Sequence, residues 1–290
     1  MAEATASLRV GVVGLGMMGS GMAASLDAAG LLEAVVDVRS EVFEERPELA
    51  GRARPTPAAL AGDVDVVFVV VIDRPQIETV LFGPDGLVEG ARPGLVVCLC
   101  STVSAEDIAA VAAAAEGSNL VVVDVGIAGG PDAAATGGLL TTIGADDATF
   151  EQLRPCLDAL SVRSIHAGPL GTGMKLKLVK NTLSYLVMCA THEALLLGEE
   201  LGFPSSLVGE VARESNLLDH FFWFPVSRPS ARPMGDDADP QVVTANRHFT
   251  DIAVKDLLAA GVTADAAGMD HPVMDLAVQL APRYFLLPED

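Results

Sequence analysis

Hydrophobic residues in the first half of the chain form short β-branched runs separated by alanine-rich stretches. The runs predict six strands, at residues 8–13, 34–38, 64–72, 95–99, 120–125 and 139–143. The stretches between them predict helices, most clearly at 17–29 and 105–115. Strands that alternate with helices indicate βαβ units and a parallel sheet. Runs such as VDVVFVVVI are apolar on both faces, as expected for strands that helices cover on both sides.

The pattern changes near Gly168. After the segment HAGPLGTG, apolar residues recur every three or four positions from about Thr172 to Leu201, which predicts one long helix. Further helices are expected at 205–214, 249–260 and 272–280, and an irregular loop is expected over the Pro-rich stretch 225–240. The sequence therefore predicts an α/β domain followed by an all-helical one.

The charge balance restricts the partners of the chain. Its 290 residues include 18 Lys and Arg against 39 Asp and Glu, a formal net charge of −21. Such a chain repels phosphate backbones and anionic lipid heads, which disfavours nucleic-acid and membrane-surface binding. A small anionic substrate would need a local cluster of the few cationic side chains, so each such cluster is informative.

Three further features concern the location of the protein and metal binding. No apolar run approaches the ~20 residues that span a bilayer, and the start of the chain lacks the features of a signal peptide. The four cysteines are expected to be reduced, buried thiols of a cytoplasmic protein. Because neither they nor the five histidines have metal-ligand spacing, we expect no metal site.

The first predicted strand leads into a glycine-rich turn with the spacing G-x-G-x-x-G. The turn consists of Gly14, Leu15, Gly16, Met17, Met18 and Gly19. It opens a helix, and the next strand ends at Asp37, 23 residues after Gly14, which is the context of a dinucleotide-binding fingerprint rather than of a turn without a ligand. Asp37 would bind the adenosine ribose and repel a 2′-phosphate, which favours NAD. Arg39 could face such a phosphate or lie in solvent, so NADP is not excluded.

Two more loops follow predicted strands, at the sheet edge where α/β proteins bind ligands. Ser101 and Thr102 could contact the nicotinamide ribose, or could equally well cap the helix that starts near Ala105. Gly129 and Gly130 could present backbone N–H groups to a carboxylate. Taken alone, the paired glycines would be better explained as a flexible turn.

A lysine and an asparagine lie one turn apart near the start of the long helix. Lys177 and Asn181 share one face of this helix. Burial and the nearby Lys180 would both lower the pKa of Lys177 and make it a usable general acid or base. The alternative is a solvated lysine stripe with an incidental asparagine, and Lys175 and Lys180 could be no more than that.

Together, these segments resemble the β-hydroxyacid dehydrogenase family, which includes 3-hydroxyisobutyrate dehydrogenase, tartronate semialdehyde reductase and, more distantly, 6-phosphogluconate dehydrogenase. The resemblance covers nearly the whole chain and rests on five motifs in order. They are GLGMMGSGMAASL, FGPDGL with PGLVVCLCSTVS, GGPDAAATGGL, GTGMKLKLVKN and FTDIAVKDLLAA.

The resemblance implies a Rossmann-type dinucleotide-binding domain over residues 1–168 and a helical substrate and oligomerisation domain over 169–290, joined by a long interdomain helix. It further implies a homodimer or homotetramer. Lys177 matches the family's catalytic lysine, and Asn181 matches its substrate-binding asparagine. Gly129 and Gly130 match the loop that holds the substrate carboxylate, and Lys255 matches a lysine near the cofactor.

One position departs from the family pattern. The carboxylate loop usually starts with a serine whose hydroxyl helps to hold the acid, and here Ala128 occupies that position. A methyl group cannot donate a hydrogen bond. Either the two N–H groups and a cation suffice, or the substrate differs. The aromatic run at 221–224 could signal a larger pocket, although helix packing or a subunit interface explains most such rings better.

We therefore expect an NAD(P)-dependent oxidoreductase that acts on a small β-hydroxyacid or the matching semialdehyde. One rival is an imine reductase-like enzyme, because those relatives share the glycine loop and the helical domain but usually lack the catalytic lysine. Ala128 mildly favours this rival, whereas the pair Lys177 and Asn181 opposes it. The other rival is a cofactor-binding protein that kept the fold and lost catalysis, which the same pair argues against.

Overall fold

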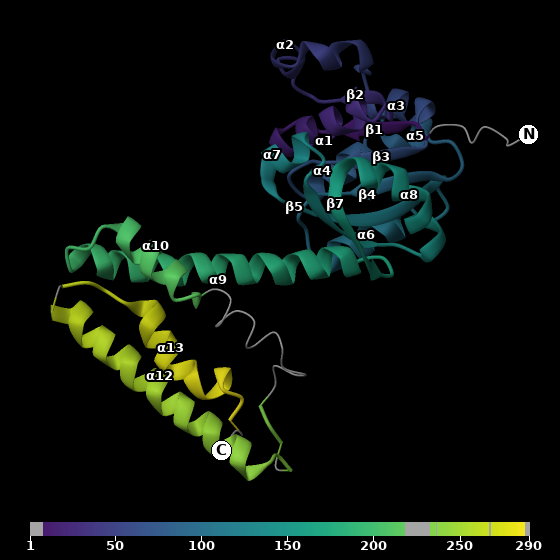
Figure 1. Cartoon of the computed structure of the whole chain (residues 1–290). Coiled ribbons are helices and arrows are strands. Elements are labelled where there is room, and N and C mark those ends of the chain that lie inside the picture. Colours follow the sequence, from purple (N-terminus) through teal and green to yellow (C-terminus); the bar gives the residue numbers. More distant parts are fainter. Residues whose placement is uncertain (1–7, 218–232, 236, 267, 288–290) are drawn as a thin grey trace, which may run out of the picture. The chain divides into compact units, whose positions relative to one another are not determined.

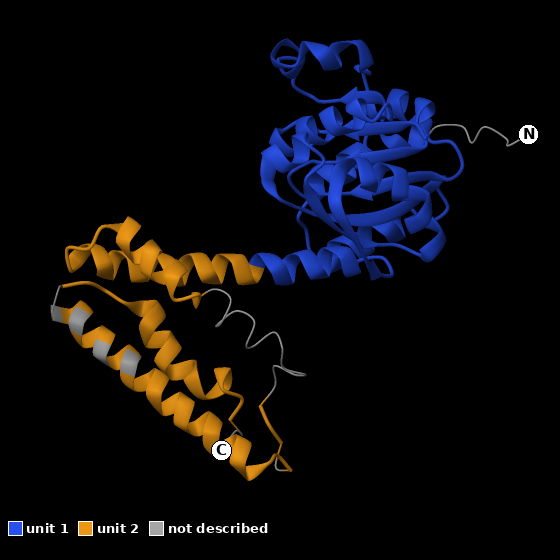
Figure 2. Ribbon diagram, in the orientation of Figure 1, with its two compact units in different colours: residues 1–181 blue, residues 182–290 orange. Residues whose placement is uncertain are grey.

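A computed structural model describes residues 8–217, 233–235, 237–266 and 268–287 of the chain (Figure 1). The aromatic run at 221–224 and most of the loop expected at 225–240 lie outside the described residues. The chain divides into two compact units, residues 1–181 and 182–290 (Figure 2). This division falls within the long helix, downstream of the change in sequence pattern at residue 168.

The first unit is built on a seven-stranded sheet with the order β2-β1-β3-β4-β5-β6-β7. Its strands are β1 (Val10–Val13), β2 (Leu32–Val36), β3 (Val66–Val69), β4 (Leu95–Leu99), β5 (Leu120–Ala128), β6 (Leu139–Gly144) and β7 (Ser161–Gly168). The first five run parallel, β6 is antiparallel to β5, and β7 is parallel to β6. The predicted Rossmann-type fold is confirmed, and the carboxyl ends of five parallel strands lie along the same edge of the sheet.

Helices cover both faces of this sheet. One face carries α1 (Met17–Ala28), α7 (Gly130–Ala135) and α8 (Asp147–Leu160), while the other carries α3 (Pro57–Asp63), α4 (Arg74–Phe82), α5 (Leu87–Gly90) and α6 (Ala105–Ala114). The short α2 (Val42–Glu45) and the 3-10 helix η1 (Pro47–Arg52) follow β2. Thr56, Asp73, Ser104 and Asp146 start α3, α4, α6 and α8, each accepting a hydrogen bond from a first-turn N–H.

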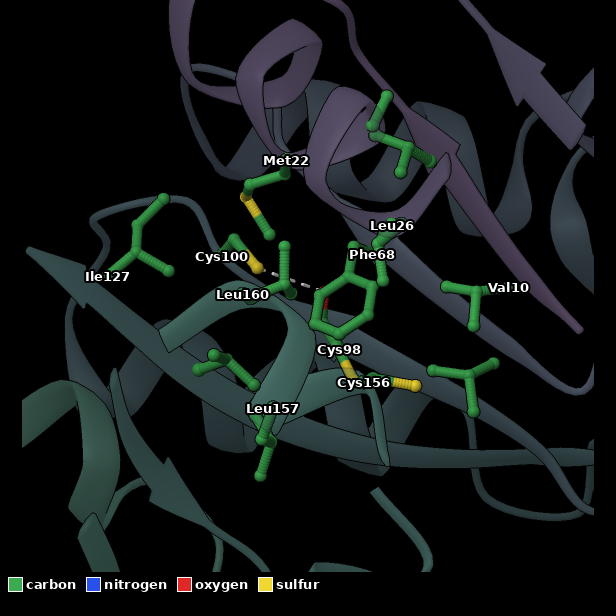
Figure 3. Packing of buried hydrophobic residues seen from close by; sticks show 14 of the residues in the cluster. Val10, Met22, Leu26, Phe68, Cys98, Cys100, Ile127, Cys156, Leu157 and Leu160 are labelled. Atoms are coloured by element: carbon green, nitrogen blue, oxygen red, sulfur yellow. Dashed lines mark hydrogen bonds between the residues drawn. The ribbon is translucent and has the colours of Figure 1, made fainter. Parts of the chain in front are cut away.

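Each face of the sheet has its own apolar cluster, because successive strand residues point to opposite sides. In β3, Phe68 belongs to one cluster and Val67 to the other. Figure 3 shows the first cluster, which contains Phe68 of β3, Met22 and Leu26 of α1 and, beside the Phe68 ring, Leu160 of α8. The first unit therefore buries a two-sided core that holds the strand ends in fixed positions.

The second unit is helical among its described residues. The long helix α9 (Thr172–Glu200) starts in the first unit and ends in the second, where α10 (Ser205–Glu214), α12 (Pro240–Ala266) and α13 (Pro272–Tyr284) follow. The buried carboxylate of Glu193 accepts hydrogen bonds from the backbone N–H groups of Val273, at 2.9 Å, and Met274, at 2.7 Å. This contact ties the start of α13 to α9. None of the described helices combines the length and apolarity needed to cross a bilayer.

Two elements differ from the sequence prediction. The strand β7 was not expected, because its sequence SVRSIHAG has no apolar run. It lies at the edge of the sheet, where Val162 and Arg163 are exposed and the other residues are half-buried. The helix α12 begins at Pro240 rather than at residue 249. Proline is well suited to a first helical turn, so the residue that was expected to end a loop starts a helix instead.

Candidate active site

A cleft of about 380 Å³ lies in the first unit, at the carboxyl ends of its central parallel strands. Three loops line it, after β3 (residues 70–72), after β4 (residues 100–102) and at the end of β5 (residues 127–130). Met18 of α1 and three residues of α9, Lys177, Lys180 and Asn181, complete the lining. The structure thus brings together five segments that are far apart in the sequence. This is the edge at which open α/β sheets bind ligands.

The glycine-rich turn connects β1 to α1 in a conformation that depends on its glycines. Gly14 has φ +91°, which favours glycine, and a Cβ on Gly19 would clash with the carbonyl oxygen of Gly14. Gly16 is exposed, with open space where a side chain would project, and no side chain caps the helix that follows it. The first-turn N–H groups of α1 are therefore available to an anionic group. Met17 is 80% exposed, and Met18 faces the cleft.

Asp37 lies just beyond β2 and is tied to the glycine-rich turn. Its carboxylate, which is 6% exposed, accepts hydrogen bonds from the Leu15 N–H at 2.6 Å, the Arg39 N–H at 2.9 Å and the Arg39 Nε at 3.0 Å. Burial raises the pKa of Asp37, but the hydrogen bonds from Arg39 and Leu15 outweigh burial, so the pKa lies below its ordinary value. The ionised carboxylate of Asp37, paired with the exposed Arg39, therefore lies next to the turn.

The start of α9 is held against the sheet by a buried carboxylate. Asp124 of β5 is completely buried, and its two oxygens accept the N–H groups of Gly171 and Met174, each at 2.5 Å. Thr142 of β6 donates its hydroxyl to the carbonyl oxygen of Gly173 at 2.9 Å. Burial raises the pKa of Asp124, although the backbone hydrogen bonds oppose that rise. These contacts fix the first turn of α9, and Lys177 follows one turn later.

Lys177 is the most buried lysine among the described residues of the cleft, with 8% of its surface exposed. Its stem packs on β5 at Gly126, where an added Cβ would lie 2.7 Å from the Lys177 Cβ. Burial lowers the pKa of its amine, the neighbouring Cys100 thiol acts in the opposite direction, and the charge of Lys180 lowers the pKa further. A larger fraction of the Lys177 amine is thus neutral near neutral pH than for a solvated lysine.

Residues 128–130 approach the same cleft from the end of β5. Gly129 and Gly130 have φ values of +129° and +81°, so this turn also needs glycine. Ala128 lines the cleft with a methyl group and thus offers no side-chain donor. Thr102 is exposed in the cleft, and Ser101 is 3% exposed with a hydroxyl that has no hydrogen-bond partner in the described part of the chain.

The candidate residues with two possible roles differ in whether they line the cleft. Ser104, not Ser101 or Thr102, caps α6, and it forms a capping box with Asp107. Lys180 lines the cleft and is therefore not simply part of a solvated stripe, whereas Lys175 is exposed and does not line it. Lys255 is an exposed residue of α12 in the second unit and is not among the residues that line this cleft of the first unit.

Other lining residues were not singled out from the sequence. The loop at 70–72 and Ile127 are apolar and carry no chemical signal. Cys100 belongs to the core cluster shown in Figure 3, where its Sγ points to the Cys98 carbonyl oxygen at 3.7 Å, and burial raises the pKa of its thiol to about 12. The core thus forms one side of the cleft, and Cys100 lines it as a protonated thiol that is not activated as a nucleophile.

Residues 9–168 match a family model described as the NAD binding domain of 6-phosphogluconate dehydrogenase. Among curated proteins, an uncharacterised oxidoreductase of Mycobacterium tuberculosis is 32% identical, over 93% of this chain and 91% of its own. An NAD-dependent L-serine dehydrogenase of Pseudomonas aeruginosa is 30% identical, over 94% and 90%. An L-threonate dehydrogenase of Escherichia coli is 32% identical, over 92% and 85%.

Solved structures show the same likeness. An oxidoreductase of Mycobacterium avium matches 98% of this chain and 100% of its own with a TM-score of 0.81 and 28% identity. An imine reductase of a Pseudomonas species matches 95% of this chain and 93% of its own with a TM-score of 0.78, but at 19% identity this likeness concerns the fold alone. The sequence relatives, two of which are named as dehydrogenases of L-serine and L-threonate, are the more informative comparison.

Proposed function

Because the chain belongs to the β-hydroxyacid dehydrogenase family and is an NAD-dependent oxidoreductase, we propose that Lys177 is its general acid and base in the oxidation of a small hydroxyacid. The observation that carries this proposal is the position of Lys177. Its amine is buried, has a lowered pKa, and lines a cleft with Asn181 and the glycine loop 129–130. A solvated lysine would have none of these properties.

The residues around the cleft fit a nicotinamide dinucleotide. Gly14 and Gly19 allow the tight turn and its close packing, Gly16 leaves open space at the start of α1, and this uncapped helix start suits a pyrophosphate. The carboxylate of Asp37 suits ribose hydroxyls, which supports NAD, and Arg39 leaves NADP as the alternative. When bound, the cofactor supplies the hydride acceptor. The proposed ligands also include Leu15, Met17, Met18 and Thr102, and Lys255 through the resemblance alone.

Lys177 would move the proton that accompanies hydride transfer. In oxidation, its neutral amine accepts the proton of the substrate hydroxyl as the carbinol carbon gives up hydride. In reduction, the ammonium form returns that proton to the carbonyl oxygen. Asn181, one turn along α9, would donate a hydrogen bond to the reacting oxygen or to the acid group. The backbone N–H groups of Gly129 and Gly130 would hold the acid group, next to the methyl of Ala128.

We also propose that the protein is a cytoplasmic homodimer or homotetramer, and that its copies associate through the second unit. In that unit α9 exposes large apolar side chains, which are Leu183, Tyr185, Leu186, Val187, Met188 and Leu196. These side chains project on several sides of the helix, and exposed apolar surface of this extent is typical of an interface. The cysteines support a reducing compartment, since all four are free thiols. Burial was expected for all of them, but only Cys98, Cys100 and Cys156 are buried, and Cys189 of α9 is exposed.

The proposal is tested by changing Lys177 to alanine and measuring NAD reduction with L-serine, L-threonate and 3-hydroxyisobutyrate. Loss of a general base should lower turnover by about 10²–10⁴-fold. NAD affinity, measured separately by fluorescence titration, should be retained. The matched control is Lys175→Ala, two residues earlier on the same helix and outside the cleft. Near-normal turnover in Lys177→Ala would remove this residue from the mechanism, and a wild-type preference for cyclic imines would favour the imine reductase alternative.

A further inference from the structure

The cleft has an unusual charge for this protein. The chain as a whole carries a net charge of −21, and it contains only four lysines, three of which fall at positions 175, 177 and 180. Two of these three line the cleft, and the lining contains no Asp, Glu or Arg. A strongly acidic protein thus has a locally cationic cleft, and such a cleft attracts a small anion that the rest of the protein would repel.

Lys180 has a position distinct from that of Lys177. It lies three residues after Lys177 and directly before Asn181, so all three side chains emerge on neighbouring positions of one helix face. Lys177 is buried, whereas Lys180 is exposed at the cleft. Burial lowers the pKa of the Lys177 amine, so this group can be neutral and can exchange a proton. The two lysines therefore offer the substrate two different groups.

The loop at the end of β5 offers a substrate carboxylate few hydrogen-bond donors and no charged partner. Gly129 and Gly130 provide only backbone N–H groups, and Ala128 adds no donor. A carboxylate removed from water needs charged or multiple hydrogen-bond partners, because an underpaired buried charge is costly. Lys180 lines the same cleft and can supply this partner.

Building on the proposed function, we propose that Lys180 binds the carboxylate of the substrate and restricts the enzyme to small monocarboxylate hydroxyacids. When Lys177 is neutral, Lys180 is the remaining cation among the cleft's lining residues, which matches a single negative charge. A dicarboxylate would leave one acid group without a cationic partner. An ester of the same hydroxyacid would gain nothing from Lys180.

The test compares 3-hydroxyisobutyrate with its methyl ester in wild type, Lys180→Met and Lys180→Arg. Methionine keeps the apolar stem and the helix propensity but removes the charge. At alkaline pH, where the Lys177 amine is neutral in both proteins, Lys180→Met should raise KM for the acid by about 10- to 100-fold, the usual worth of a charge-assisted hydrogen bond. Its kcat for the acid and its KM for the ester should change far less, and Lys180→Arg should restore most of the loss.

Lys175→Met is the matched control, because it removes a lysine of the same helix that does not line the cleft. It should leave both KM values near those of wild type. Equal KM values for the acid in wild type and Lys180→Met would overturn the assignment, as would equal effects on acid and ester.

A binding measurement separates this inference from the proposed function. Isobutyrate lacks the hydroxyl and cannot react, so its affinity for the NAD-loaded protein reports carboxylate binding alone. Isothermal titration calorimetry should show a loss of about 10- to 100-fold in Lys180→Met. If isobutyrate binds through Lys180 but no hydroxyacid is oxidised, the catalytic proposal fails and this one stands. If hydroxyacids are oxidised but isobutyrate binds both proteins equally, only the role of Lys180 fails.

Discussion

The two units anchor a helix in the same way but differ in what surrounds the anchor. Asp124 in the first unit and Glu193 in the second are both buried, and each accepts two backbone N–H groups at the start of a helix. Asp124 holds the helix that carries Lys177, and it stands within a unit that buries two apolar clusters. Glu193 holds α13, in a unit whose long helix leaves many apolar side chains exposed. This difference fits the two proposals above, chemistry in the first unit and association through the second.

The strongest test of this comparison exchanges each anchor for its amide. Asp124→Asn and Glu193→Gln should both destabilise the protein, by about 1–3 kcal/mol, because the amide NH₂ faces an N–H that then lacks an acceptor. Only Asp124→Asn should also lower kcat, by roughly 10²-fold, since displacing a catalytic group by about 1 Å can cost that much. Urea unfolding and steady-state kinetics measure the two effects. Equal kcat in the two variants would show that Asp124 has no positioning role.

The second test concerns the exposed apolar side chains. Leu186 on α9 of the second unit is 63% exposed, and Val162 on β7 of the first is 79% exposed. If the second unit associates, Leu186→Ser should weaken the oligomer by up to about 1.5–3 kcal/mol per buried side chain. Val162→Ser should leave association unchanged. Sedimentation equilibrium distinguishes these outcomes, and a wild-type monomer at all concentrations would contradict the proposed assembly.

The sequence predicted the parts of the site that depend on local pattern. The G-x-G-x-x-G spacing placed the turn between β1 and α1, and the four-residue spacing placed Lys177 and Asn181 on one face. The anchor at Asp124 could not be found in this way, because its partners lie 47 and 50 residues away. Nor could spacing show that Lys180 and not Lys175 faces the cleft, since this depends on how α9 packs on β5.

A third test compares Gly126 of β5, on which the start of α9 packs, with Gly198 near the end of α9. An added methyl at Gly126 would meet the Lys177 Cβ at 2.7 Å and clash with the Thr142 hydroxyl, so Gly126→Ala should cost about 1–3 kcal/mol by overpacking and lower kcat. At Gly198 the methyl would meet only one side-chain atom, Cγ2 of Val208, at 2.8 Å, so Val208 would have to shift. Because alanine is the better helix former, this cost is partly offset, and Gly198→Ala should destabilise less than Gly126→Ala and leave the rate unchanged. Thermal unfolding and kcat measure both, and a rate loss in Gly198→Ala alone would reverse the assignment.

The smallest expected effect is a pH dependence that originates in the first unit alone. Burial and the charge of Lys180 lower the pKa of Lys177, with Cys100 opposing them, so the folded pKa lies below the unfolded one. Oxidation should therefore rise with pH and level off below the pH at which an ordinary lysine becomes neutral, and Lys180→Met should move this limb to higher pH.

The same shift predicts a stability effect of defined sign. Below the folded pKa, Lys177 must carry its charge in a buried site, which costs stability, and this cost disappears as pH rises through the folded pKa toward the unfolded one. Lys177→Met should thus raise the unfolding midpoint at neutral pH and lose this advantage at alkaline pH, whereas Lys175→Met should show no such trend. A midpoint difference that is independent of pH would mean that the amine is not held in a desolvating site, and the contrast between a catalytic first unit and an associating second unit would lose its chemical basis.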